Sequence, residues 1–236
     1  MQATRPSSLK SAMAISLLAL AALLLWDASG ADAALARLAG TPAGFPWRSA
    51  PVLAVWMHDG GKALGWALVA ALLLAVRWPV GALRRLPRAQ RWQLALGPVL
   101  AVAAVTLLKQ HSQTSCPWDL QAFGGSAAWV SHWQWGVGDG GPGHCFPAGH
   151  ASTAFCFLGG WFVLRDAAPR AAWAWLGAAA AAGLVLGLGQ QWRGAHFMSH
   201  TLWSAWICWM VGLGLEGLAR ASRGRRACRA AVPSRS

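Results

Sequence analysis

The sequence is poor in charged residues. Only 11% of the 236 residues are Asp, Glu, Lys or Arg, whereas an average globular protein has roughly 25%. Because 56% of the residues are hydrophobic, the shortage of charge excludes a disordered chain and argues against an ordinary soluble domain. Tyrosine is absent although there are 17 Trp residues, and this combination favours a membrane protein.

Acidic residues are the scarcest charged group. Seven Asp and Glu residues stand against 20 Lys and Arg residues, so the formal net charge is +13. Such an excess by itself suggests a nucleic-acid partner. The mean hydropathy of +0.40 supports the competing interpretation, a membrane protein with an uneven charge distribution. The position of the excess charge along the chain decides between the two.

Six apolar stretches are candidates for membrane-spanning helices. A span needs about 20 mostly apolar residues, with roughly 17 as the short end. The candidates are residues 11–26, 63–76, 92–108, 148–164, 171–192 and 201–215. The second is short, although Lys62 could extend toward the interface. These stretches predict an all-α protein, a bundle of six transmembrane helices.

The distribution of basic residues predicts the orientation of this bundle. Six spans place both termini on one side, which the positive-inside rule assigns to the cytoplasm. The segments on that side then hold 15 of the 20 Lys and Arg residues and only 2 of the 7 acidic residues, so the other side is neutral. We predict a multi-pass protein of the bacterial cytoplasmic (inner) membrane with both termini cytoplasmic. We predict one domain, residues 1–218, and a basic cytoplasmic tail, residues 219–236, which favours anionic lipid over nucleic acid.

The first span has a second interpretation. Basic residues precede an apolar run over residues 12–26, and Ala31-Asp32-Ala33 resembles a signal-peptide cleavage site. In either interpretation the segment that follows emerges on the outer side of the membrane.

Three polar segments, residues 109–119, 143–152 and 190–200, lie at the predicted outer ends of spans. In the second, Pro and Gly precede a helix start, whose free N–H groups form an anion site. His150 beside these donors can transfer a proton to a phosphoester oxygen. In the third, His196 and His200 lie one turn apart on one face if the residues from His196 onward are helical. With Arg193 and Lys109, these side chains predict a phosphate site with a nitrogen nucleophile.

These segments resemble the type 2 phosphatidic acid phosphatase superfamily, which consists of membrane phosphatases with six helices. The family motifs are KxxxxxxRP, PSGH and SRxxxxxHxxxD. Phe-Pro-Ala-Gly-His-Ala-Ser and Arg-Gly-Ala-His-Phe-Met-Ser-His resemble the second and third motifs, and the match covers residues 109–204. The resemblance implies that Lys109 binds phosphate and Gly149 donates a backbone N–H. It also implies that His150 is the general acid and His196 the nucleophile that forms a phosphohistidine.

The sequence departs from the family motifs at four positions, which are Cys116 for Arg, Ala148 for Ser, Gln190 for Arg and His200 for Asp. Arg193 could supply a guanidinium one turn beyond Gln190. A neutral His200 can accept a hydrogen bond but offers no negative charge to the nucleophile. In an alternative register His200 is the nucleophile and His196 its partner. We still expect Ala148 and Gln190 to lie among the phosphate-binding residues, at the positions of the family's Ser and Arg.

Cys116 and Cys145 share the outer loop, and we predict that they form a disulfide in an oxidising periplasm. The alternative is a metal site made of His111, Cys116, His144 and Cys145. Because these residues lack a compact ligand spacing, we predict no metal and no other cofactor.

We predict a phosphoric-ester hydrolase that acts on a lipid phosphomonoester or pyrophosphate at the periplasmic face. One alternative is a lipid-phosphate phosphotransferase, and another is a catalytically impaired phosphate-binding protein. A vanadate-dependent haloperoxidase would have a similar site, but the membrane spans argue against it. The expected partners are the lipid substrate and the membrane, without nucleic acid, and the oligomeric state is left open.

Overall fold

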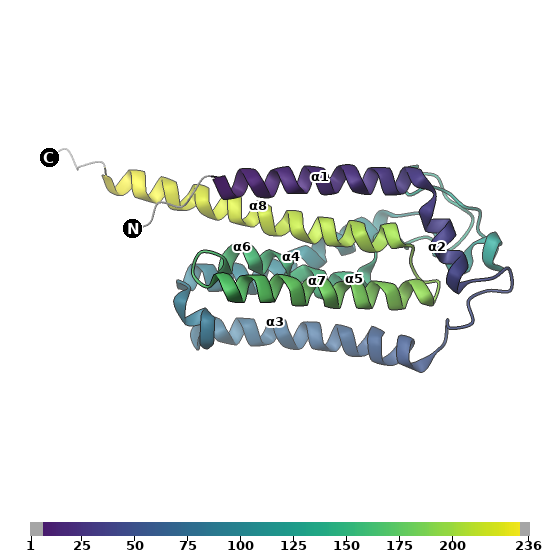
Figure 1. The fold of residues 1–236 in the computed structure, drawn as a ribbon, viewed down its shortest axis with the longest axis horizontal. Helices are drawn as coiled ribbons and strands as arrows, with labels where there is room; N and C mark the ends of the chain where they lie inside the picture. Colours follow the sequence, from purple (N-terminus) through teal and green to yellow (C-terminus); the bar gives the residue numbers. More distant parts are fainter. Residues whose placement is uncertain (1–6, 232–236) are drawn as a thin grey trace.

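The computed structural model describes residues 7–231, and within this range the chain forms helices and no β-strands. The α-helices are α1 (Ser7–Ser29), α2 (Ala31–Ala39), α3 (Gly61–Arg77), α4 (Arg88–His111), α5 (Gly149–Phe155), α6 (Gly160–Leu164), α7 (Pro169–Trp192) and α8 (Met198–Ala231). The long helices lie side by side in one elongated bundle (Figure 1). The chain is therefore all-α, as predicted.

Within residues 7–231, five helical segments are long and apolar enough to cross a membrane, namely Leu9–Ser29, Val52–Arg85, Arg88–His111, Pro169–Trp192 and Met198–Arg225. They contain five of the six predicted stretches. The remaining stretch corresponds to the shorter apolar segment Gly149–Leu164, where a 3-10 turn (Cys156–Gly159) separates α5 from α6. The outward side chains are apolar as well, since Leu18 is 71% and Leu25 73% exposed. Such a surface is suited to lipid.

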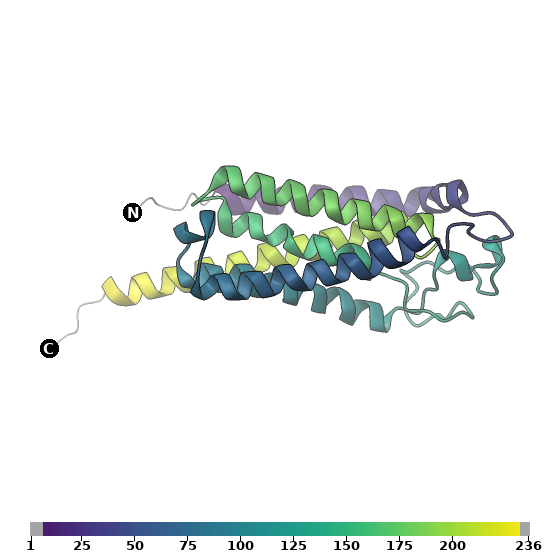
Figure 2. The same cartoon turned by 90° about the horizontal axis from the view of Figure 1, so that it is seen from below.

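The long connection between α4 and α5 lies at one end of the bundle, and the start of α1 and the end of α8 lie at the other. α1 begins and α8 ends at one end, as an even number of spans requires (Figure 1). Figure 2 shows the long connection between α4 and α5, residues 112–148, together with α2 at the other end. The connection contains two short 3-10 turns, at Pro117–Asp119 and Gln121–Phe123. A π-helical segment, Val52–Gly60, directly precedes α3. A 3-10 turn at Gly81–Arg85 joins α3 to α4 at the end where α8 finishes.

α1 packs along α8 as part of the bundle. The indole of Trp206 donates a hydrogen bond to the Ser16 carbonyl (3.0 Å), and that of Trp209 donates to the Ser16 hydroxyl (2.8 Å). Ala12 and Leu213 form a buried cluster with Phe162. These contacts make α1 a packed helix of the bundle.

Two helical features were not expected from the sequence. α2 begins directly after Gly30, at the position that resembles a cleavage site, and its buried Ala36 and Ala39 pack with Phe45. α8 continues through Ala231, so the first part of the predicted tail is helical. Residues 232–236 of that tail lie outside the described residues.

Candidate active site

The three polar segments converge at the end of the bundle that holds residues 112–148. Lys109 lies in the last turn of α4, His150 in the first turn of α5 and His196 in the loop before α8. The ring centroids of His150 and His196 are 5.9 Å apart. A Cβ atom at Gly149 would lie 3.7 Å from the Lys109 Nζ atom, so the absence of a side chain leaves space beside the ammonium group.

Backbone and hydroxyl hydrogen bonds tie the start of α5 to α8. The Ala148 N–H donates to the His200 carbonyl (3.1 Å). The buried Ser204 hydroxyl lies 2.9 Å from both the Ala148 and the His200 carbonyl oxygens. These bonds hold the first turn of α5 against the histidines of the third segment. Because the Ala148 N–H is already bonded, it is not a free donor for a phosphate oxygen.

His196 is buried, with only 2% of its surface exposed. Burial lowers the pKa of His196 well below its ordinary value, and the positive charge of Lys109 lowers it further. The neighbouring imidazoles act in the same direction, while a hydrogen bond with the Cys145 backbone acts against them. The ring is therefore neutral at pH 7, which is the form that can act as a nucleophile.

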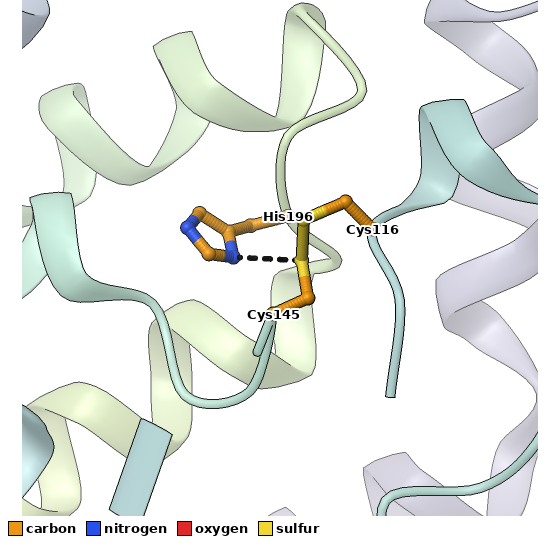
Figure 3. Close-up of side chains that lie close together, drawn as sticks. All are labelled: Cys116, Cys145 and His196. Carbon is orange, nitrogen blue, oxygen red and sulfur yellow. Dashed lines mark hydrogen bonds between the residues drawn. A yellow bond between two sulfur atoms is a disulfide. The ribbon is translucent and has the colours of Figure 1, made fainter. Parts of the chain in front are cut away.

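A disulfide lies directly beside this imidazole (Figure 3). It joins Cys116 to Cys145, with an S–S distance of 2.07 Å. The Cys145 sulfur is 3.5 Å from His196 Nδ1 and 3.0 Å from the Ala195 carbonyl oxygen. Figure 3 shows the second ring nitrogen on the side away from the disulfide, so Nε2 is the atom available for chemistry.

The two sulfur atoms and a His196 ring nitrogen lie within 4.8 Å of one another, which is close enough for a metal ion. A disulfide offers no thiolate, however, and thiolates are the cysteine ligands that metals prefer. His111 and His144, the other two groups of the metal alternative, are exposed and bond elsewhere. His111 Nδ1 is 2.8 Å from the Leu107 carbonyl oxygen, and His144 Nδ1 is 3.3 Å from that of Lys109.

A pocket of about 350 Å³ opens beside the polar end of α4 and α5. Lys109, Gly149 and His150 line its polar part. Its apolar part lies between α3 and α4 and is lined mainly by Trp66, Val69, Pro98, Val99 and Val102. His196 does not line the pocket but lies next to His150. The pocket can hold a phosphate with a hydrocarbon chain attached.

Arg193 and Gln190 lie together, away from this pocket. The Arg193 guanidinium donates to Gln190 Oε1 (3.1 Å) through Nη1 and to the Arg48 carbonyl (2.9 Å) through Nε. Neither residue lines the pocket. The structure therefore brings together Lys109, Gly149, His150 and His196, and it pairs Arg193 with Gln190 outside that group.

His200 is 1% exposed, and its ring centroid is 5.8 Å from that of His196. Its Nδ1 atom is buried and has no hydrogen-bond partner among the residues that the structure describes. The His200 ring therefore lies next to the His196 ring, although His196 precedes the helix α8, which begins at Met198.

Sequence reasoning missed three acidic and imidazole groups near the site, which are Asp27, Asp32 and His132. Asp32 accepts hydrogen bonds from the backbone N–H (2.9 Å) and the hydroxyl of Ser199, and so caps the start of α8. His132 contacts Asp27 (Nε2 to Oδ2, 3.3 Å). The scarcity of acidic residues marks both aspartates as unusual, but more than 100 residues separate each from its partner.

Comparison with known proteins identifies the family and the fold. A family model, the PAP2 superfamily, matches residues 90–221, more than half of the chain. A crystal structure of a transmembrane PAP2 type phosphatidylglycerolphosphate phosphatase from Bacillus subtilis is similar, with a TM-score of 0.53 and 17% sequence identity. The match covers 90% of this chain and 96% of that one, and at this identity it shows the fold alone. No curated protein sequence matches. The predicted resemblance is confirmed, and the chain belongs to the PAP2 superfamily, with the fold of a transmembrane phosphatase.

Proposed function

We propose that this protein hydrolyses a lipid phosphomonoester or pyrophosphate at the periplasmic face through a phosphohistidine intermediate. One observation carries the proposal. A buried, neutral His196 lies beside His150, and His150 and Lys109 together line the polar end of an apolar pocket. This arrangement combines a nucleophile, a proton donor and a cation at the place where a lipid phosphate fits.

In the first step the Lys109 ammonium binds the phosphate in the space that Gly149 leaves open. Nε2 of His196 attacks phosphorus, and the bond from phosphorus to the lipid oxygen breaks. Protonated His150 donates its proton to the departing oxygen. The products of this step are the lipid alcohol and phosphorylated His196.

In the second step neutral His150 takes a proton from water as the water attacks phosphorus. The bond from phosphorus to nitrogen breaks, and inorganic phosphate leaves. The Lys109 cation neutralises charge that develops on the phosphoryl oxygens in both steps. Because Arg193 and Gln190 pair with each other, the proposal assigns them no phosphate contact in this conformation.

The charge distribution supports a periplasmic site. The basic residues concentrate in the segments that include the α3–α4 connection and the end of α8, and those segments share one end of the bundle. The site lies at the opposite end, beside the disulfide. Under the positive-inside rule, this distribution supports a site outside the cytoplasm and termini inside it.

The test is to trap the intermediate. Protein purified in detergent is incubated with radiolabelled phosphatidate, an isoprenoid pyrophosphate and a phosphorylated glycolipid, and both released phosphate and protein-bound label are measured. We expect wild type to form the adduct with at least one substrate and His196→Ala to form none. The exposed His111→Ala is the control and should behave as wild type.

Loss of the adduct in His200→Ala but not in His196→Ala would assign the nucleophile to His200 instead. The absence of both phosphate release and adduct with all three lipids would contradict the proposed hydrolysis.

A further inference from the structure

A row of imidazole rings runs from the pocket into the protein and ends at a carboxylate. The ring centroids of His150 and His196 are 5.9 Å apart, those of His196 and His200 5.8 Å, and those of His200 and His132 6.0 Å. His132 Nε2 is 3.3 Å from Asp27 Oδ2. The row draws on five separate parts of the chain, since Asp27 is in α1, His132 in the connection between α4 and α5, His150 in α5, His196 in the loop before α8 and His200 in α8.

The inner part of this row has no direct counter-charge. His196 and His200 are buried, and the nearest cation that affects His196 is Lys109. Among the residues that the structure describes, no carboxylate forms a hydrogen bond or an ion pair with either ring. A positive charge in such surroundings is unfavourable unless an anion compensates it. His196 gains positive charge when its nitrogen bonds to phosphorus, so an anion near the row would favour the proposed chemistry.

Asp27 is held firmly at the far end of the row. Its Oδ2 atom accepts hydrogen bonds from the indole N–H groups of Trp203 (2.9 Å) and Trp133 (3.1 Å), in addition to the contact with His132. The His132 ring stacks on Phe146, with centroids 4.1 Å apart and planes 8° from parallel. The carboxylate and the imidazole therefore have defined positions, as a charged pair that orients another group must have.

A small cavity borders the same groups. It has a volume of about 70 Å³ and is lined by Asp27, Asp32, His132 and His200 together with loop residues. This volume is sufficient for a few water molecules, at roughly 10–15 Å³ each. Burial lowers the pKa of His132, and the Asp27 charge opposes that shift, so the two groups are electrostatically coupled. His200 thus lies between this coupled pair and His196.

We propose that the Asp27–His132 pair is the counter-charge of the imidazole row and acts through His200 to stabilise positive charge on His196. This inference rests on the proposed function, because it names the groups that support its nucleophile. Asp27 and His132 are positioning residues in this scheme and do not touch the substrate. The other charged groups around the row are Lys109 at the pocket and Asp32 at the start of α8.

The principal test is Asp27→Asn, which removes the charge but keeps an oxygen that can accept the two indole hydrogen bonds. We expect phosphoenzyme formation to slow by about 10- to 100-fold, as when a carboxylate that orients a reactive imidazole is lost. The KM for the lipid should remain within about twofold, because the pair does not contact substrate. The acid limb of the pH profile should move to lower pH, since loss of an anion disfavours imidazole protonation.

Two further variants identify the pair as a unit. His132→Gln should reproduce the kinetics of Asp27→Asn, and the double variant should lose little more than either single one. Asp27→Glu should recover part of the rate because it restores the charge. A double variant whose losses multiply would show that the two residues act separately and would overturn the proposal.

Asp139→Asn is the matched control. Asp139 is also a buried carboxylate of the outer region, and it accepts hydrogen bonds from the backbone N–H groups of Ser115 (2.6 Å) and Gly141 (3.0 Å). Its loss should lower thermal stability but leave the pH profile of the folded protein unchanged. The proposal fails if Asp27→Asn keeps the wild-type rate and pH profile, or if Asp139→Asn gives the same kinetic change.

A measurement that needs no activity separates this inference from the proposed function. Histidine resonances of ¹⁵N-labelled protein in detergent are titrated for wild type and Asp27→Asn. We expect the His196 and His200 signals to titrate at lower pH in the variant, together with His132. A shift confined to His132 would overturn the inference, whereas a wild type without phosphatase activity would overturn only the proposed function.

Discussion

The protonation state of His196 depends on its tertiary surroundings more than on its neighbours in sequence. The motif identifies the residue, but the neutral state arises from burial and from the nearby Lys109 charge. Local sequence contains no measure of burial for a loop residue between two helices. Local sequence likewise does not show that Gly149 leaves open space beside the Lys109 ammonium group.

The lowered pKa of His196 predicts a pH dependence of stability. The unfolded chain takes up a proton below about pH 6.5, whereas the folded chain resists protonation until a lower pH. The contribution of His196 to the free energy of unfolding is therefore complete above about pH 6.5. It is lost as the pH falls toward the pKa of the folded state, by up to about 1.4 kcal/mol per pH unit. Thermal unfolding of wild type and His196→Gln between pH 5 and 8 should show a weaker acid destabilisation in the variant. Parallel pH dependences would contradict the prediction.

Gly149→Ala tests the phosphate space directly. The new methyl group would lie 3.7 Å from the Lys109 Cδ and Nζ atoms, which is ordinary contact, so the fold should persist. We expect phosphatase activity to fall by up to about a hundredfold, because displacing a bound phosphate by a small distance misaligns the attack. Gly177→Ala, where a Cβ meets no atom within 4 Å, is the control for activity and melting temperature. Equal activity in the two variants would exclude a phosphate at Gly149.

At the scale of helices, two glycines determine how closely α8 approaches the break between α5 and α6. A Cβ added at Gly212 would overlap the backbone of Gly159, whereas one at Gly214 would meet no atom within 4 Å. Small residues allow such close helix packing in membranes. The indole of Trp175 also donates to the Phe157 carbonyl in this break (2.6 Å), which satisfies a group that the α-helical pattern leaves free.

Gly212→Ala should therefore destabilise the bundle by about 1–3 kcal/mol, because the helices must separate to admit the methyl group. Gly214→Ala, two residues away on the same helix, should be neutral or stabilising by about 0.5–1 kcal/mol. The comparison is made by thermal unfolding in one detergent. A Gly212→Ala protein as stable as Gly214→Ala would show that the two backbones are not in close contact.

At the scale of the whole molecule, the disulfide joins the segment after α4 to the segment before α5. It links residues 29 positions apart and places a sulfur beside His196. Closing a loop of this length stabilises the folded state by about 3–4 kcal/mol in the chain-entropy description. Cys116→Ala should thus lower the melting temperature and the activity, while Cys156→Ala, at a buried free thiol, serves as the control for cysteine loss.

Mass spectrometry provides the complementary measurement for the same prediction. After denaturation, Cys116 and Cys145 should be alkylated only if a reductant is present, whereas Cys156 should be alkylated without it. Alkylation of all three thiols in the absence of reductant would contradict the disulfide.

The sequence alone determined the helical class, the membrane-spanning character and the family. Apolar stretches are local, so the structure reproduces five of the six stretches as long helices and the sixth as a shorter segment. The motif positions of Lys109, His150 and His196 were likewise readable, because residue type and spacing are preserved along the chain. The helix α2 was not predicted, because its nine residues are held in place by tertiary contacts such as that between Asp32 and Ser199.

Only the tertiary structure decided which groups surround His196. Packing paired Arg193 with Gln190 and brought Asp27 to His132 across more than 100 residues. It also gave the Ala148 N–H a hydrogen bond to the His200 carbonyl. Such contacts depend on how helices pack against one another, and no local pattern encodes that packing. The sequence therefore determined which residues could perform the chemistry, and the packing determined their burial, their partners and their charge.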